Sequence, residues 1–253
     1  MTTTEPQTPD RASTSRPDLH PNGVNHLALS TADMKMQLTF WGDVLGCPTK
    51  ALYWMHGVAN TFHGFVELAP DSYVAFVQAP DNPTEIEWGI THAGTAGDPV
   101  TAGTMQHVAL NVDTIDDVLM MRDRIRGHGI QVLGPIDHGM IQSIYFAGPE
   151  GLSLEVCTGH SIDQHQWVDP EVQQLCGVSD DELASLERPA AFDRPDHPVP
   201  QPPFDPSKPN MHYPARVRET LMGMPDDDVW DNLSETTPPV EIDAAKRDLA
   251  DRS

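Results

Sequence analysis

Long apolar runs and cysteines are scarce in this sequence. No apolar run approaches the roughly 20 residues that a membrane-spanning helix needs, and the segment before Arg16 is polar. The three cysteines, Cys47, Cys157 and Cys176, are widely spaced and form no CxxC pair, which excludes a disulfide framework and a structural zinc site of that kind. We therefore expect a cytoplasmic protein with no membrane partner.

Basic residues are also few. The chain has 15 Lys and Arg against 38 Asp and Glu, which gives a formal net charge of −23. A field of this sign repels the phosphates of nucleic acids, so nucleic acid is excluded as a partner. What is present is a chain of 253 residues with 38% hydrophobic residues, enough to bury a core.

Composition divides the chain into three regions. Residues 1–22 are rich in Thr, Ser, Pro and charge and predict a disordered N-terminal arm. Residues 23–158 alternate short apolar runs with helical stretches and Gly or Pro turns, which indicates a globular domain. Residues 159–253 predict an extension with short helices, one of them opening with a capping box of Ser179 and Glu182, and a Pro-rich arm. We expect this extension to cover the domain or a second copy of the chain.

An internal repeat organises the globular domain. The stretch that begins at Val24 aligns with the stretch that begins at Met105 at a constant offset of 81 residues. Each copy, module one (23–80) and module two (104–158), has the pattern of a strand, an amphipathic helix, a Gly stop and three shorter strands. This predicts an α+β fold in which two tandem βαβββ modules form a cupped mixed sheet. The later strands are expected near residues 52–55, 60–68 and 72–78, and near 131–135, 141–147 and 153–157.

Two histidines and a glutamate stand out within the repeat. His26 and His107 occupy equivalent positions, and side chains alternate along a strand, so both belong to equivalent faces. Glu155 is a carboxylate in an otherwise apolar last strand, where it needs a partner. Two imidazoles and one carboxylate are the ligand set that leaves three positions of iron(II) open. The alternative is that the histidines are ordinary strand residues and that Glu155 pairs with an arginine.

Residues 24–158 resemble the vicinal oxygen chelate superfamily, which includes glyoxalase I, fosfomycin- and bleomycin-resistance proteins and type I extradiol dioxygenases. The similarity lies in the histidine near the start of each module, in FWGDVLG of the first helix and in YFAGPEGLSLEV at the end of module two. The resemblance implies a metal ion bound by His26, His107 and Glu155.

The segment 136–155 is similar to the extradiol ring-cleavage signature. The matching residues are His138, Ile144, Tyr145, Pro149, Gly151 and Glu155, whereas Gly148 stands where the pattern prefers Asp, Glu, Asn, Thr or Ala. Tyr145 lies on the strand that a tight turn joins to the strand of Glu155, so its hydroxyl is expected to reach a substrate oxygen. His138 lies in the loop just before and is expected to donate a proton.

A further acid/base residue is expected on module one. Extradiol enzymes generally carry a histidine in the last strand of the preceding module, and alignment of that strand places Tyr73 there, with His63 one strand earlier as a substitute. A glyoxalase-like site would take its fourth ligand from the same strand, where alignment of the hairpin turns places Phe76, which cannot ligate. Glu67 is the nearby carboxylate considered as a fourth metal ligand. Three protein ligands favour an open iron(II) site over a closed lyase site.

These expectations define a function. The chain is expected to be an oxygen-dependent, Fe(II)-containing dioxygenase that cleaves a catechol-type aromatic ring, with Mn, Co, Ni or Zn as alternative metals. The resemblance also implies a homodimer or a higher homo-oligomer. One alternative is a non-oxidative enzyme of the same superfamily, such as a glyoxalase-like lyase, an epimerase or a thiol transferase. The other is a metal-free protein that binds a small molecule.

Overall fold

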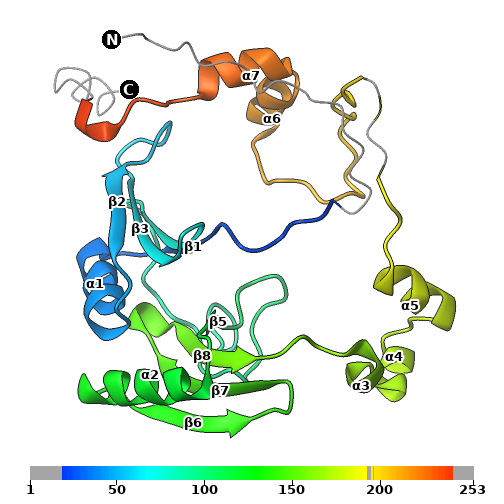
Figure 1. Ribbon diagram of the computed structural model, residues 1–253. Coiled ribbons are helices and arrows are strands. Elements are labelled where there is room, and N and C mark those ends of the chain that lie inside the picture. The colour runs from blue at the N-terminus through cyan, green and yellow to red at the C-terminus, as the bar shows by residue number, and fades with distance from the viewer. Residues whose placement is uncertain (1–18, 193–194, 196, 242–253) are drawn as a thin grey trace. The chain divides into compact units, whose positions relative to one another are not determined.

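The structure is a computed structural model that describes residues 19–192, 195 and 197–241 (Figure 1). Its internal contacts separate two compact units, of which the larger contains residues 23–177 and the smaller contains the described residues from 178 onward and before 23. The predicted N-terminal arm falls mostly on residues 1–18, which lie outside the described residues. In the part of the chain that is described, no helix is both long and apolar enough to cross a membrane.

Module one is a mixed sheet of four strands in the order β1-β4-β3-β2. β1 runs parallel to β4, and the other neighbours are antiparallel, as expected for a strand followed by a helical crossover and a meander. Its elements are β1 (His26–Ser30), α1 (Met34–Thr39), the π-helix η1 (Phe40–Val44), β2 (Thr49–Trp54), β3 (Phe62–Ala69) and β4 (Ser72–Gln78).

Module two repeats this topology in the order β5-β8-β7-β6, again with a single parallel pair, β5 with β8. The two modules confirm the predicted α+β fold of tandem βαβββ units. The elements are β5 (Val108–Asn111), α2 (Ile115–Gly127), β6 (Val132–Asp137), β7 (Ile141–Ala147), the 3₁₀ turn η2 (Pro149–Gly151) and β8 (Ser153–Gly159).

The crossover helices begin at side-chain caps. Asp33 accepts a hydrogen bond from the backbone N–H of Met36, and Thr114 forms a reciprocal capping box with Asp117 at the start of α2. The first crossover ends at Gly46, whose φ of +82° is a left-handed conformation that glycine adopts without strain. These local signals fix where each crossover helix begins and where the first crossover ends.

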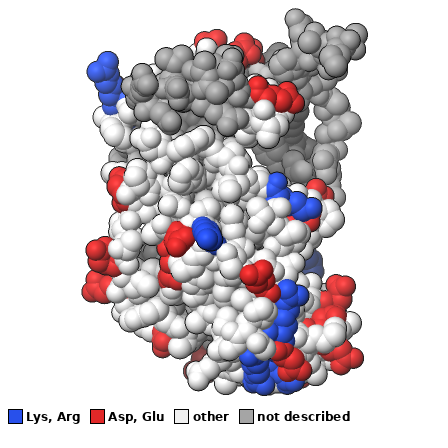
Figure 2. Space-filling model, turned by 90° about the vertical axis from the view of Figure 1, so that its left-hand side faces the viewer, with Lys and Arg blue, Asp and Glu red and all other residues white. Residues whose placement is uncertain are grey.

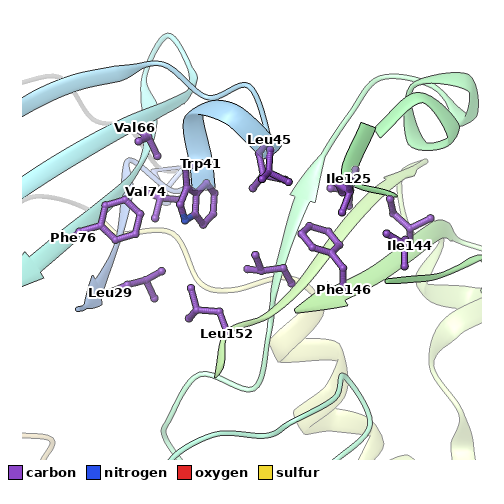
Figure 3. Close-up of a cluster of buried hydrophobic side chains, with 14 of the residues drawn as sticks. Leu29, Trp41, Leu45, Val66, Val74, Phe76, Ile125, Ile144, Phe146 and Leu152 are labelled. Atoms are coloured by element: carbon purple, nitrogen blue, oxygen red, sulfur yellow. The ribbon is translucent and has the colours of Figure 1, made fainter. Parts of the chain in front are cut away.

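One apolar core lies beneath both sheets (Figure 3). Each strand turns alternate side chains toward this core and the others toward the opposite face. The fully buried side chains include Trp41, Val66, Phe76, Val118, Ile125, Ile144 and Leu154. Leu27 and Leu29 face the core from β1, and Val108 and Leu110 face it from β5. Because side chains alternate, His26 and His107 lie on the opposite faces.

Polar contacts also join the two modules. The carboxylate of Glu150, in the turn between β7 and β8, accepts hydrogen bonds from Thr31 Oγ1 at 2.6 Å and from the backbone N–H of Ala32 and Gln37 Nε2 at 2.7 Å each. Arg124 of α2 donates to carbonyl oxygens of η1. These contacts fix module two to the start and to the end of the first crossover.

The rest of the chain is helical or irregular. The larger unit ends with α3 (Gln164–Trp167) and α4 (Pro170–Leu175), and the smaller contains α5 (Asp180–Glu187), α6 (Ala215–Met222), α7 (Asp226–Leu233) and the 3₁₀ turn η3 (Pro239–Glu241). The predicted capping box of Ser179 and Glu182 is confirmed at the start of α5. Within the smaller unit, the guanidinium of Arg218 lies 3.7 Å from the ring centroid of Phe204, which ties the Pro-rich segment to α6.

Charged side chains are dispersed on the face drawn in Figure 2. Acidic groups are scattered across it among uncharged residues, and several basic groups gather at the lower right of the view beside acidic ones. Acidic and basic groups thus lie side by side on this face, whereas the whole chain carries a formal net charge of −23.

Candidate metal and acid/base site

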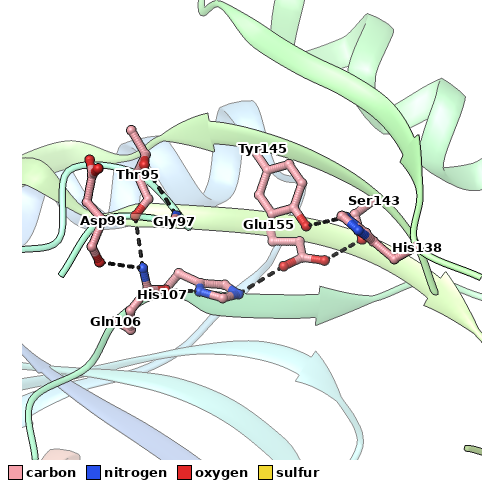
Figure 4. A network of polar contacts seen from close by, with 9 residues as sticks. All are labelled: Thr95, Gly97, Asp98, Gln106, His107, His138, Ser143, Tyr145 and Glu155. Atoms are coloured by element: carbon pink, nitrogen blue, oxygen red, sulfur yellow. Dashed lines mark hydrogen bonds and ion pairs between the residues drawn. The ribbon is translucent and has the colours of Figure 1, made fainter. Parts of the chain in front are cut away.

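A buried carboxylate lies at the centre of module two. Glu155 on β8 is 2% exposed, and its Oε2 lies 3.0 Å from His107 Nε2. Ser143 on β7 donates its hydroxyl to the other oxygen, Oε1. Figure 4 shows the three side chains converging from neighbouring strands. The sheet register explains the convergence, because Glu155 lies opposite Ala109 on β5, two residues beyond His107 and on the same face.

The predicted acid/base residues of module two lie beside this carboxylate. Tyr145 is directly opposite Glu155 in the β7–β8 register, and its hydroxyl shares a hydrogen bond of 2.9 Å with His138 Nε2. Burial raises the pKa of Tyr145, and the nearby Glu155 carboxylate raises it further, against a lowering contribution from Ser143. The hydroxyl therefore stays protonated at neutral pH and can donate a hydrogen bond.

The structure places His26 apart from this group. It lies on β1, its Nδ1 is 2.9 Å from Asn25 Oδ1, and its ring meets Phe65 edge to face at 5.7 Å. Among the described residues there is no group of three or more His, Cys, Asp or Glu that could hold a metal ion. The structure thus brings two of the three predicted ligands together, His107 and Glu155.

The face of module one that carries His26 is lined with aromatic rings. Tyr53 and Phe65 lie parallel at 6.3 Å, and the ring of His63 lies 4.5 Å from Phe65. Burial lowers the pKa of His63, and the neighbouring His26 and His56 lower it further, so this imidazole is neutral near pH 7.

The two predicted acid/base residues of module one, His63 and Tyr73, differ in how their polar atoms are hydrogen-bonded. The Tyr53 hydroxyl lies 3.2 Å from His63 Nδ1, and His63 Nε2 is buried without a hydrogen-bond partner. Tyr73 lies opposite His26 in the register, and its hydroxyl donates to the carbonyl oxygen of Pro70 at 2.8 Å. His63 therefore keeps an unused nitrogen, whereas the Tyr73 hydroxyl is engaged by its own turn.

The register corrects one equivalence drawn from the sequence. Glu155 lies opposite Ala109 and Ala75 lies opposite Ala28, and the repeat aligns Ala28 with Ala109, so the counterpart of Glu155 is Ala75 and not Phe76. Phe76 is fully buried on the core face instead. Neither residue can ligate a metal. Glu67 is engaged by Lys50 in an ion pair of 2.8 Å.

Three residues of these networks were missed by the sequence prediction. Ser143 was not singled out although it holds Glu155, and Asn25 and Gln106 were not singled out although each carboxamide contacts the histidine that follows it. The sequence signal for Asn25 and Gln106 is a carboxamide residue directly before each repeated histidine.

The chemistry of the pair fits a divalent cation. A carboxylate oxygen and an imidazole nitrogen at 3.0 Å need a hydrogen or a cation between them, either an N–H of the ring or a metal ion bound to both. Imidazole and carboxylate together suit first-row divalent metals. The fold and this pair define a class of protein with two βαβββ modules and ionisable groups on the helix-free face of the sheet.

Comparison with known proteins identifies the family. Residues 23–156 match the family model described as "Glyoxalase/Bleomycin resistance protein/Dioxygenase superfamily". The chain belongs to this superfamily, which confirms the resemblance given by the sequence motifs.

Individual relatives are more distant. A curated relative, "Biphenyl-2,3-diol 1,2-dioxygenase 2" of Rhodococcus globerulus, is 35% identical over 66 residues, which are 25% of this chain and 35% of that protein. The match therefore spans about a third of the relative's length. Among solved structures, a glyoxylase/bleomycin resistance protein/dioxygenase domain from Frankia sp. EAN1pec is 13% identical with a TM-score of 0.46, over 56% of this chain and 100% of that one. The fosfomycin resistance protein FosX from Listeria monocytogenes, solved with Mn(II) and sulfate, is 15% identical with a TM-score of 0.38, over 56% and 95%.

Proposed function

We propose that this chain is a metal-dependent dioxygenase that cleaves a catechol-type aromatic ring with O2. One observation carries the proposal: the Glu155–His107 pair and the Tyr145–His138 pair lie on one face of module two. The first pair suits a metal and the second suits proton transfer to a substrate oxygen. The partial match to a biphenyl-2,3-diol dioxygenase supports the same reaction class.

We propose His26, His107 and Glu155 as the residues that would hold the metal, with Fe(II) as the metal for this chemistry. Bound iron would supply the electron transfer between a catechol and O2 that protein side chains cannot provide. Ser143 fixes one oxygen of Glu155 and leaves Oε2 directed at His107. His26, which the structure places apart from this pair, is proposed as the third donor, and its ring is exposed at the start of β1.

In this proposal Tyr145 and His138 handle protons. The Tyr145 hydroxyl, kept protonated by its burial, donates to an oxygen of the substrate, and His138 exchanges a proton with that hydroxyl through their 2.9 Å contact. On module one, the neutral ring of His63 is the candidate base. Tyr73 is assigned to the wall of the site because its hydroxyl donates to Pro70.

The test is oxygen uptake measured together with visible absorbance. Apoprotein is reconstituted anaerobically with Fe(II) and offered a panel of catechols, with His107→Ala as the inactive control and Gln142→Leu as a matched variant outside the proposed site. We expect O2 consumption in proportion to a yellow ring-opened product, retained by Gln142→Leu and lost by His107→Ala. Iron binding without oxygen uptake across the panel would refute the dioxygenase and leave a non-oxidative enzyme of the superfamily.

A further inference from the structure

Each predicted histidine ligand follows a residue with a carboxamide side chain. Asn25 precedes His26 and Gln106 precedes His107, so the two amides obey the same offset of 81 residues as the histidines. In both modules the amide oxygen faces the Nδ1 of the next residue: Asn25 Oδ1 lies 2.9 Å from His26 Nδ1, and Gln106 Oε1 contacts His107 Nδ1. The same contact has thus formed twice, in two separate sheets.

Hydrogen bonds made by Nε2 fix the orientation of the Gln106 side-chain amide. Its Nε2 donates to the carbonyl oxygens of Thr95 at 2.9 Å and Asp98 at 3.1 Å (Figure 4). Only the NH2 group of an amide can donate to a carbonyl, so the oxygen must face His107. Since that oxygen can only accept, His107 Nδ1 carries the hydrogen. The connector between the modules therefore determines which ring nitrogen of His107 is protonated.

This arrangement leaves Nε2 as the ring nitrogen that a metal can take. His107 Nε2 is the atom that lies 3.0 Å from Glu155 Oε2. A neutral imidazole has one donor and one acceptor nitrogen, and a metal takes the acceptor. His107 Nε2 and Glu155 Oε2 therefore face each other, and a metal bound to both would replace the hydrogen of their contact.

We propose that Asn25 and Gln106 are positioning residues that select the Nε2-ligating tautomer of His26 and His107. The proposal rests on the proposed metal site and concerns residues that touch neither metal nor substrate. Hydrogen bonds to the distal nitrogen of a ligating histidine typically change metal affinity by about 10- to 100-fold. Gln106 is held by two backbone carbonyls, so its loss is expected to have the larger effect of the two.

The first experiment measures Zn²⁺ affinity of the full chain by competition with a chromophoric chelator, without substrate or oxygen. Gln106→Leu removes the acceptor, whereas Gln106→Glu keeps an acceptor oxygen toward His107 but cannot donate to the carbonyls of Thr95 and Asp98. We expect Gln106→Leu to weaken Zn²⁺ binding about 10- to 100-fold and Gln106→Glu to restore part of the affinity. Asn25→Leu and Asn25→Asp form the corresponding pair. Gln142→Leu, which removes an amide bonded to Asp137 instead of a histidine, is the control and should bind as the parent does.

The second experiment reads the tautomer directly. Long-range ¹⁵N–¹H NMR of the zinc-loaded protein should show His107 with a hydrogen on Nδ1 and Nε2 coordinated, and a weakened preference in Gln106→Leu. A coordinated Nδ1 in the parent protein, or unchanged zinc affinity in Gln106→Leu, would overturn the positioning role. A parent protein that binds no divalent metal would refute the metal site and this role together. Zinc binding that depends on Gln106, with no oxygen uptake by the iron form, would refute only the dioxygenase.

Discussion

Replacing His107 by alanine tests the central pair in the absence of metal. The variant leaves the Glu155 carboxylate, which is 2% exposed, without the His107 imidazole that contacts it. Removing one partner of a fully buried ion pair costs about 3–5 kcal/mol, whereas an exposed pair contributes about 0.2–1 kcal/mol. The His107 side chain is 30% exposed. We therefore expect His107→Ala to lower the free energy of unfolding by about 2–3 kcal/mol, between these limits.

The assay is urea denaturation of the metal-free protein, followed by circular dichroism. A loss of this size corresponds to a fall of about 4–12 °C in the thermal midpoint of a domain this large. His26→Ala is the matched control, because His26 is the exposed equivalent in module one and its loss should cost less than about 0.5 kcal/mol. If both variants lose the same stability, the carboxylate does not depend on His107.

A double variant separates the pair from general packing. Glu155→Gln neutralises the buried group while keeping its shape, so its combination with His107→Ala should be less destabilising than the two single effects added. Contacting residues of this kind show coupling of about 0.5–3 kcal/mol. Strict additivity would mean that the 3.0 Å contact contributes nothing to folding.

Three other predictions concern different parts of the larger unit. Glu150→Ala should lower the free energy of unfolding by about 2–4 kcal/mol in urea titrations, because it leaves buried donors of module one without their acceptor; a loss below about 1 kcal/mol would contradict this. Because burial lowers the pKa of His63 in the folded state, the unfolded chain binds more protons below about pH 6.5, so stability should fall as pH drops through that range. Denaturation of His63→Gln at pH 5.5 and 7.5 should show a smaller difference than the parent. Gly151→Ala should lower the thermal midpoint, because its φ is +75° and a Cβ there would lie 2.9 Å from Ile86 Cδ1; an unchanged midpoint would refute the close contact.

Most of the fold could be predicted from the sequence because two independent signals agree. Alternation of apolar residues predicts the strands, and the repeat predicts the same order of strands and helix in both modules. The bounds of β4 (Ser72–Gln78) and β7 (Ile141–Ala147) coincide with the predicted ranges for this reason. The first crossover helix was not predicted to change into the π-helix η1, since that change leaves its apolar periodicity almost intact.

The misplaced equivalence of Phe76 has a geometric cause. The hairpin of module one turns through residues 70–71, whereas the hairpin of module two turns through residues 148–152. Aligning the two turns on their prolines therefore shifts the register by one position, and a shift of one residue exchanges the two faces of a strand. The ladder places Ala75 at the position of Glu155.

The amide contacts could not be predicted because they join residues without periodicity. Gln106 is held by carbonyl oxygens of Thr95 and Asp98, in a connector that has no apolar pattern. Backbone carbonyls are present at every residue, so sequence alone does not show which of them an amide will reach. Only the position of Gln106 directly before a repeated histidine carried information.

Comparison of equivalent positions shows how the two modules differ. Glu155 and Tyr145 of module two correspond to Ala75 and Phe65 of module one, because each pair lies directly opposite in its own ladder. Module one therefore has the histidine but neither the carboxylate nor the phenol, and it presents an aromatic face in their place. In the proposed site the carboxylate and the phenol come from module two, and module one adds His26, His63 and a hydrophobic wall. Among the described residues, the repeat thus provides one candidate site for the chain and not one for each module.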